Sequence, residues 1–122
     1  MNMISILLVD DEVMAVDVGT KVLEKLGYKV TPVTRSLEAL DIFRKQPLEF
    51  DLVITDYNMP GMNGGELASK IRFIRTDIPI ILCTGYASIP ESKLQKWGID
   101  ALLLKPYRSK EIDHLVSETV RK

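Results

Sequence analysis

The sequence predicts an α/β domain of the doubly wound type, with a five-stranded parallel sheet covered by helices on both faces. Two observations carry this prediction. Short apolar runs alternate along the chain with segments whose apolar residues recur at helical spacing, and four of the runs are followed by an acidic, hydroxyl or ammonium side chain. The length of 122 residues and the apolar content of 46% suit one domain with its own core. We therefore expect residues 1–122 to form a single domain.

The first strand is expected at residues 4–9, an apolar run that ends in acidic residues, as buried parallel strands do. Residues 16–26 then carry apolar side chains at helical spacing. Gly27 stands where a glycine commonly follows the end of a helix. Residues 28–31 form a second, shorter strand that we expect to end before Pro32.

The next segment should contain a helix, a strand and a loop. Ser36 is the expected N-cap of the helix, and a third strand follows at residues 52–55. Residues 58–65 are rich in Asn, Gly and Pro, which is typical of a loop. Asn63, with Glu66 three residues later, resembles a capping box and predicts the start of another helix.

The last third of the chain repeats the alternation. Residues 78–83 form the fourth expected strand. A second capping box at Ser88 and Glu91 starts a helix that runs to Trp97. Residues 101–104 form the fifth strand, and Ser109 is the expected N-cap of the final helix.

Composition and charge exclude several classes of protein. Lys and Arg number 16 against 17 Asp and Glu, so a net charge of −1 provides no basic excess for a nucleic-acid backbone. The single cysteine, Cys83, excludes a disulfide within the chain and a cysteine-based zinc site. The apolar run 6–9 is too short for a signal peptide or a membrane span. We expect a cytoplasmic protein that neither binds nucleic acid directly nor inserts into a membrane.

The residues directly after the expected strands carry the candidate chemistry. Asp10 and Asp11 follow the first strand, Asp56 the third, Thr84 the fourth and Lys105 the fifth. Ligands of open parallel sheets bind outside the carboxyl ends of the strands. We therefore expect these five side chains to converge on one crevice.

Such a group of side chains suits one kind of reaction. Carboxylates brought together repel one another unless a cation lies among them, and oxygen ligands favour Mg²⁺ over zinc or copper. Lys105 can pair with an added anion, and Thr84 can donate a hydrogen bond to it. A metal, an ammonium and a hydroxyl around one carboxylate favour phosphoryl transfer, with that carboxylate as the nucleophile. Taken singly, the acids have simpler explanations, such as complementing a helix dipole or forming a turn. The joint pattern favours the functional interpretation.

Short motifs at the strand ends resemble the receiver domain of two-component response regulators. They are Val9-Asp10-Asp11, Asp56 with Met59-Pro60-Gly61-Met62-Asn63-Gly64, Thr84-Gly85 and Lys105-Pro106. The spacings of 45, 28 and 21 residues between Asp11, Asp56, Thr84 and Lys105 also fit that family. The resemblance covers essentially the whole chain and implies a chemotaxis-regulator-like, flavodoxin-like sheet with strand order 2-1-3-4-5. Cys83-Thr84-Gly85-Tyr86 is more loosely similar to the receivers of hybrid sensor histidine kinases.

The resemblance implies a role for each site residue. Asp56 would accept a phosphoryl group from a phosphohistidine on a sensor histidine kinase or a histidine phosphotransfer domain. Thr84 and Lys105 would contact the phosphoryl oxygens. The protein would not be an enzyme in the usual sense, but it would promote its own phosphorylation and dephosphorylation and signal to a downstream effector. The ligands of Mg²⁺, or of Mn²⁺ in its place, would be Asp10, Asp11, Asp56 and the backbone carbonyl of Asn58.

Two further features follow from the resemblance. The Lys105–Pro106 peptide would be cis, as is usual in the family. Leu102 stands three residues before the lysine, where many receivers carry a Tyr or Phe that rotates as a switch. We therefore expect the response to phosphorylation to concentrate in residues 84–88 and to spread weakly over the fourth helix and fifth strand. Tyr86 and Tyr107 are candidates to replace the missing ring.

Three other functions share parts of this pattern. A flavodoxin-like flavin carrier needs a Ser-, Thr- or Gly-rich phosphate loop after the first strand, where Asp10-Asp11-Glu12 would repel the phosphate. An aspartyl-nucleophile phosphatase needs Asp-x-Asp at that place, and this spacing is missing. A receiver that cannot be phosphorylated normally lacks one of the acids or the lysine, and all are present. The length suits both a stand-alone regulator and a receiver taken from a longer protein.

Overall fold

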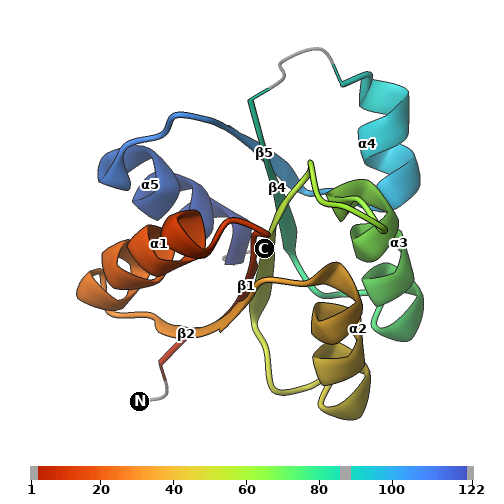
Figure 1. The fold of residues 1–122 in the computed structure, drawn as a ribbon, viewed down its shortest axis with the longest axis horizontal. Coiled ribbons are helices and arrows are strands. Elements are labelled where there is room, and N and C mark those ends of the chain that lie inside the picture. The colour runs from red at the N-terminus through yellow and green to blue at the C-terminus, as the bar shows by residue number, and fades with distance from the viewer. Residues whose placement is uncertain (1–2, 86–88, 121–122) are drawn as a thin grey trace.

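The computed structural model describes residues 3–85 and 89–120. Within them, strands and helices alternate along the chain (Figure 1), which confirms the predicted α/β class. The strands pair in parallel in the order β2-β1-β3-β4-β5, as the resemblance implied. The elements are β1 (Ser5–Val9), α1 (Val13–Lys25), β2 (Lys29–Val33), α2 (Ser36–Lys45), β3 (Leu52–Asp56), α3 (Gly64–Ile74), β4 (Ile80–Thr84), α4 (Glu91–Trp97), β5 (Ala101–Leu104) and α5 (Ser109–Val120).

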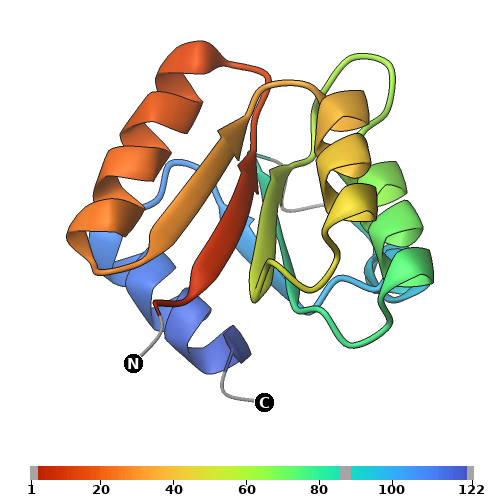
Figure 2. The ribbon, with the colours of Figure 1, turned by 90° about the horizontal axis from the view of Figure 1, so that it is seen from below.

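The helices cover both faces of the sheet. Figures 1 and 2 show α1 and α5 on one face and α2 and α3 on the other, and α4 lies beside α3. Successive residues of β1 serve the two layers in turn, since Ile6 packs with α1 and α5, and Leu7 packs with α2 and α3. Every residue of β1, β3 and β4 is buried. This double core holds the carboxyl ends of the three central strands in fixed positions.

Some predicted boundaries were wrong because they depend on neighbouring elements. The strand β2 runs through Pro32 to Val33, although we expected it to end before the proline. Because β2 is an edge strand that pairs only with β1, the missing N–H of Pro32 disrupts no ladder. The helix α1 begins at Val13, before the apolar pattern that starts at Val16, and the first residues of this turn are exposed, so the pattern did not indicate them.

The helix caps were partly predicted. The capping box is confirmed: Asn63 Oδ1 accepts from the Glu66 N–H at 2.9 Å, and Glu66 Oε1 accepts from the Asn63 N–H at 3.1 Å. The prediction for Ser36 was wrong, since the extended residue Arg35 is the N-cap of α2 and makes no side-chain cap bond. Ser88, the other predicted cap, lies outside the described residues.

Two more helix ends bear on the predictions. Ser109 is the first residue of α5, so the residue before it takes the cap position, and the Arg108 N–H donates to Glu111 Oε1 at 3.0 Å. Gly27 follows α1 with φ of 100°, as predicted. Among the described residues, none of the helices has the length and apolar character needed to cross a membrane.

The start of α3 is packed against the end of β3. The Gly64 N–H donates to the carbonyl oxygen of Tyr57 at 2.8 Å, and a Cβ on Gly64 would overlap the carbonyl oxygen of Asp56. Only glycine allows this close approach of two backbone segments. The position of Asp56 therefore depends on the absence of a side chain at residue 64.

We expect Gly64→Ala to destabilise the fold by about 1–3 kcal/mol, because the added methyl forces two backbone segments apart. The control is Gly85→Ala, since no described atom lies within 4 Å of a Cβ placed on Gly85. Its free energy of unfolding should stay within about 0.5 kcal/mol of the wild type. Urea denaturation measures both values, and equal stability of the two variants would contradict the close packing at Gly64.

Candidate functional site

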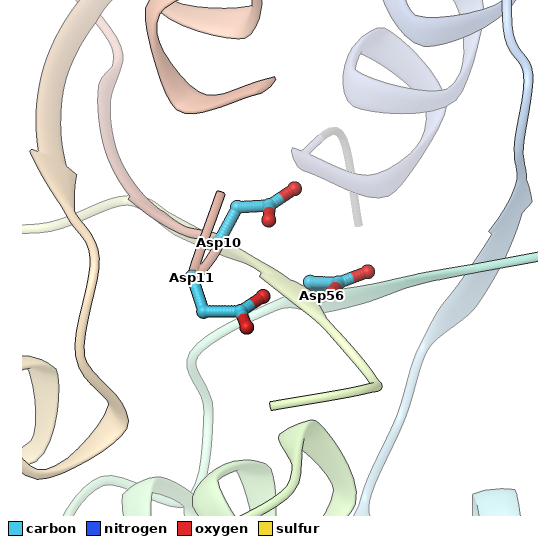
Figure 3. A group of neighbouring side chains, drawn as sticks. All are labelled: Asp10, Asp11 and Asp56. Atoms are coloured by element: carbon cyan, nitrogen blue, oxygen red, sulfur yellow. The ribbon is translucent and has the colours of Figure 1, made fainter. Parts of the chain in front are cut away.

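The acidic side chains predicted to converge lie together at the carboxyl edge of the sheet. Asp10 and Asp11 follow β1, and Asp56 is the last residue of β3 (Figure 3). One carboxylate oxygen from each residue lies within 4.8 Å of the other two. The pairing of β1 with β3 produces this cluster, because parallel neighbours end at the same edge.

Lys105 joins two of these acids. Its Nζ lies 2.8 Å from Asp56 Oδ1 and 3.1 Å from Asp10 Oδ2. The backbone N–H of Lys105 also donates to the carbonyl oxygen of Thr84 at 2.8 Å, which fixes the segment after β5 beside the end of β4. The Lys105–Pro106 peptide is cis, as expected. The lysine therefore partly neutralises the cluster from the β5 side.

A cleft of about 350 Å³ opens over the cluster. Thr84 and Asn58, both predicted site residues, line it together with Asp56 and Lys105. The Thr84 residue is only 2% exposed, so it lies at the base of the cleft, whereas Asn58 is exposed. The lining residues are Asp11, Glu12, Asp56, Asn58, Thr84, Gly85 and Lys105.

Glu12 is a cleft residue that the sequence analysis did not assign. Its backbone N–H donates to Asp10 Oδ1 at 3.0 Å, so the turn after β1 orients the Asp10 carboxylate. In the sequence, Glu12 could be noticed only because it directly follows two acidic residues. That position does not show whether it lines the cleft. Glu12 thus contributes both to the lining of the cleft and, through its backbone, to the orientation of Asp10.

The two adjacent acids have different environments. Asp10 is 7% exposed and is held by Lys105 and by the Glu12 N–H. Asp11 is exposed, and no cationic side chain among the described residues lies within ion-pair distance of it. The excess of negative charge is therefore concentrated on the open side of the cluster, where an ion from solvent can reach it.

Burial and neighbouring charges shift the protonation of the central pair. Burial raises the pKa of Asp56 above its ordinary value, and Asp10 and Asp11 add to this, while the hydrogen bond from Lys105 opposes it. Burial alone would lower the pKa of Lys105, but hydrogen bonds to Asp56 and Asp10 outweigh it and raise that pKa. Lys105 therefore stays charged, and the cluster favours the binding of a further cation.

The donor set fits a small divalent cation. Mg²⁺ takes oxygen ligands at about 2.1 Å, so two ligands on opposite sides lie about 4.2 Å apart. The carboxylate oxygens of Asp10, Asp11 and Asp56, all within 4.8 Å of one another, are close to this spacing. Hard carboxylate oxygens, with no thiolate or imidazole in the cluster, are the ligands that magnesium prefers.

An aromatic contact links the site to α4. The ring of Tyr57, the residue after Asp56, lies 5.7 Å from that of Trp97, between ring centroids. Leu102 is half-buried in β5. Of the two tyrosines proposed to replace a ring there, Tyr107 packs in the layer of α1 and α5, and Tyr86 lies outside the described residues. The link between Tyr57 and Trp97 was not predicted, because it depends on how α4 packs.

Cys83 lies beneath the site and has an unreactive thiol. It is 4% exposed at the end of β4, and burial raises the pKa of its thiol to about 12. A buried thiol with so high a pKa is a poor nucleophile. Cys83 therefore acts as a small apolar residue of the core.

An acidic cluster, a lysine and a hydroxyl at the carboxyl edge of a doubly wound sheet are the arrangement expected of a phosphoacceptor receiver domain. The model of the response regulator receiver domain matches residues 6–117, and the chain belongs to that family. This confirms the resemblance of the sequence motifs and the assignment to two-component signalling.

Individual relatives agree with the family assignment. The chain is 33% identical over 119 residues to the two-component response regulator ARR14 of Arabidopsis thaliana, covering 96% of this chain and 31% of that protein. It is 32% identical over 121 residues to the sensor kinase CckA of Brucella abortus (strain 2308), covering 97% of this chain and 13% of the kinase. The chain thus spans less than a third of either relative.

A solved structure shows the same fold with ligands in place. The response regulator TrrA of Thermotoga maritima, crystallised in complex with Mg²⁺ and beryllium fluoride, superposes with a TM-score of 0.87 at 34% sequence identity. The match covers 96% of this chain and 99% of TrrA. A relative with this fold therefore binds Mg²⁺.

We expect Mg²⁺ to stabilise the protein, because an ion that binds only the folded state shifts unfolding by mass action. At about 100 times its dissociation constant, the gain should be about 2.7 kcal/mol. Asp11→Ala should lose this gain without destabilising the metal-free protein, since it removes a like charge. Glu24→Ala, an exposed acid on α1, is the matched control and should keep it. Thermal melts with Mg²⁺ and with EDTA measure both effects, and a full Mg²⁺ gain in Asp11→Ala would contradict the assigned site.

Proposed function

We propose that residues 1–122 form one receiver domain in which the Asp56 carboxylate accepts a phosphoryl group from a phosphohistidine. The donor would be a sensor histidine kinase or a histidine phosphotransfer domain. One observation carries the choice of Asp56: of the two carboxylates bound by Lys105, it is the one that lines the cleft with Thr84 and Asn58. Asp10 is turned toward Lys105 and the Glu12 N–H and does not line that cleft.

In the proposed step, a carboxylate oxygen of Asp56 attacks the phosphorus of the donor. The P–N bond breaks, and its electron pair returns to the imidazole nitrogen. Lys105 Nζ, 2.8 Å from Asp56 Oδ1, is close enough to bind an oxygen of the incoming group. The Thr84 hydroxyl would hydrogen-bond to a second oxygen from the base of the cleft. These groups would stabilise the charge that spreads over the phosphoryl oxygens.

The metal ligands would be the carboxylates of Asp10, Asp11 and Asp56 and the backbone carbonyl of Asn58. Mg²⁺, or Mn²⁺ in its place, would supply positive charge to the phosphoryl oxygens when bound. The exposed position of Asp11 and Asn58 supports this, because the ion can enter from solvent and keep water ligands. The same opening admits water to the acyl phosphate, so the domain would also promote its own dephosphorylation.

The cellular setting belongs to the same proposal. The domain would work in the cytoplasm and pass its state to a downstream effector, with no direct contact to nucleic acid. The near-neutral charge, with 16 basic against 17 acidic residues, supports the last point. The acids after β1 argue against a flavin carrier. The presence of all three acids and Lys105 argues against a receiver that cannot be phosphorylated.

The conformational response to phosphorylation is expected to differ from that of receivers with an aromatic switch residue. Leu102 pairs with Leu82 in the sheet and has neither a ring nor a hydroxyl to follow a movement of Thr84. We therefore keep the expectation that the response concentrates after Thr84 and spreads weakly over β5 and α4. The residues of that loop beyond Gly85 and before residue 89 lie outside the described part of the chain.

With acetyl phosphate and Mg²⁺, the protein should gain the mass of one phosphoryl group, and Asp56→Asn should not, because its amide is a poor nucleophile. EDTA should suppress the gain in the wild type. Asp51→Asn is a suitable control, since this exposed aspartate at the opposite end of β3 should not affect phosphorylation. Intact-mass spectrometry gives the answer directly, and an undiminished gain in Asp56→Asn would refute the assignment.

A further inference from the structure

The most exposed large apolar side chain in the described residues lies far from the acidic cleft. Phe73, near the end of α3, is 91% exposed, and Leu48, in the loop after α2, is 85% exposed. Arg75 holds this loop against α3, because its Nη1 donates to the carbonyl oxygens of Pro47 and Phe50 at 3.0 and 2.6 Å. Both apolar side chains therefore belong to the same end of the layer formed by α2 and α3.

A groove lies beside Phe73. The helices α2 and α3 run side by side on one face of the sheet (Figures 1 and 2). Between them is a hollow of about 450 Å³ lined by Arg44, Ser69, Lys70, Phe73 and Ile74. Lys70 and Ser69 lie three and four residues before Phe73, so both neighbour it on the surface of the helix. We call this hollow the α2–α3 groove.

The α2–α3 groove is separate from the phosphorylation site. None of its lining residues lines the acidic cleft. Gly64, at the start of α3, packs against Asp56, whereas Phe73 lies nine residues later, about 13 Å along the helix. The groove thus offers a second surface that the phosphoacceptor chemistry does not use.

The charges of the groove are all positive. Neighbouring cations are paired, since Lys45 contacts Asp41, Arg72 contacts Asp100 and Arg75 contacts Asp77. Among the described residues, no carboxylate lies within ion-pair distance of Arg44 or Lys70, which line the groove. Arg44 complements the helix dipole at the end of α2. Lys70 lies within α3, where its charge does not complement a helix dipole. The side chains of Arg44, Lys70 and Phe73 are therefore available to a binding partner.

We propose that the α2–α3 groove binds an acidic segment of a partner protein that inserts an apolar side chain beside Phe73. The ring and Ile74 would cover that side chain, and Arg44 and Lys70 would pair with flanking carboxylates. Aromatic and arginine side chains are enriched where binding energy concentrates in protein interfaces. A second copy of this chain fits less well, because a symmetric contact would bring like charges together. A hollow between helices also suits an inserted chain segment better than a flat lipid surface.

The test is a selection of peptides from a random displayed library on the immobilised wild-type protein, with counter-selection on Phe73→Ser. The enriched peptides should carry an excess of Asp and Glu around an apolar anchor. Added to ¹⁵N-labelled protein, a synthetic copy should shift the amide resonances of residues 69–74 and of Arg44, and leave those of Asp10 and Asp56 in place.

Substitutions in the α2–α3 groove test which side chains bind the peptide. Phe73→Ser should weaken the peptide's affinity by about tenfold or more, and the double variant Arg44→Glu, Lys70→Glu should abolish acidic binding. Leu37→Ser is the matched control, because Leu37 is an exposed apolar residue at the other end of α2, 68% exposed, and should bind like the wild type. Each of these residues is on the surface, so the variants should fold. Circular dichroism checks the folding of every variant, and phosphorylation by acetyl phosphate checks that its acidic site is intact.

Three results would overturn the proposal. One is a selection with no enrichment that depends on Phe73, or with enriched peptides that are not acidic. Another is Phe73-dependent binding to phosphatidylglycerol vesicles without peptide binding, which would reassign the groove to a membrane surface. The third is concentration-dependent self-association that Phe73→Ser removes, which would make the partner a second copy of the chain.

Discussion

Repulsion among three carboxylates is the constraint that organises this molecule. Asp10, Asp11 and Asp56 hold carboxylate oxygens within 4.8 Å of one another, so their negative charges repel at close range. Lys105 relieves part of it by binding Asp10 and Asp56 together. The charge that remains lies toward Asp11 and the solvent. The remaining negative charge therefore favours the binding of a cation at the cluster.

The fold supplies the positions that this arrangement needs. Strands β1, β3 and β4 are buried along their whole length and end at the same edge. A backbone hydrogen bond from Lys105 to Thr84 fixes the lysine, and Gly64 lets α3 start against the carbonyl of Asp56. The same helix then carries Phe73 at its far end. The helix α3 thus packs against the acidic cluster at one end and borders the α2–α3 groove at the other.

Local signals in the sequence predicted most of this structure, and relations between distant elements account for what was missed. The apolar runs predicted the strands, and the residues after them predicted the acidic cluster, because parallel strands share one carboxyl edge. The predicted end of β2 was wrong because the local rule that proline ends a strand does not hold on an edge strand such as β2. Glu12 and the α2–α3 groove depend on turn geometry and helix packing, which no spacing of residues shows.

The claim on which the account rests is that the phosphoryl group is carried by the carboxylate of Asp56. Borohydride reduction of the protein after treatment with acetyl phosphate and Mg²⁺ tests it, because an acyl phosphate of aspartate is reduced to homoserine. Peptide sequencing by mass spectrometry should then find homoserine at position 56, and aspartate at positions 10 and 11. Homoserine at position 10 or 11, or unmodified aspartate at position 56, would contradict the assignment.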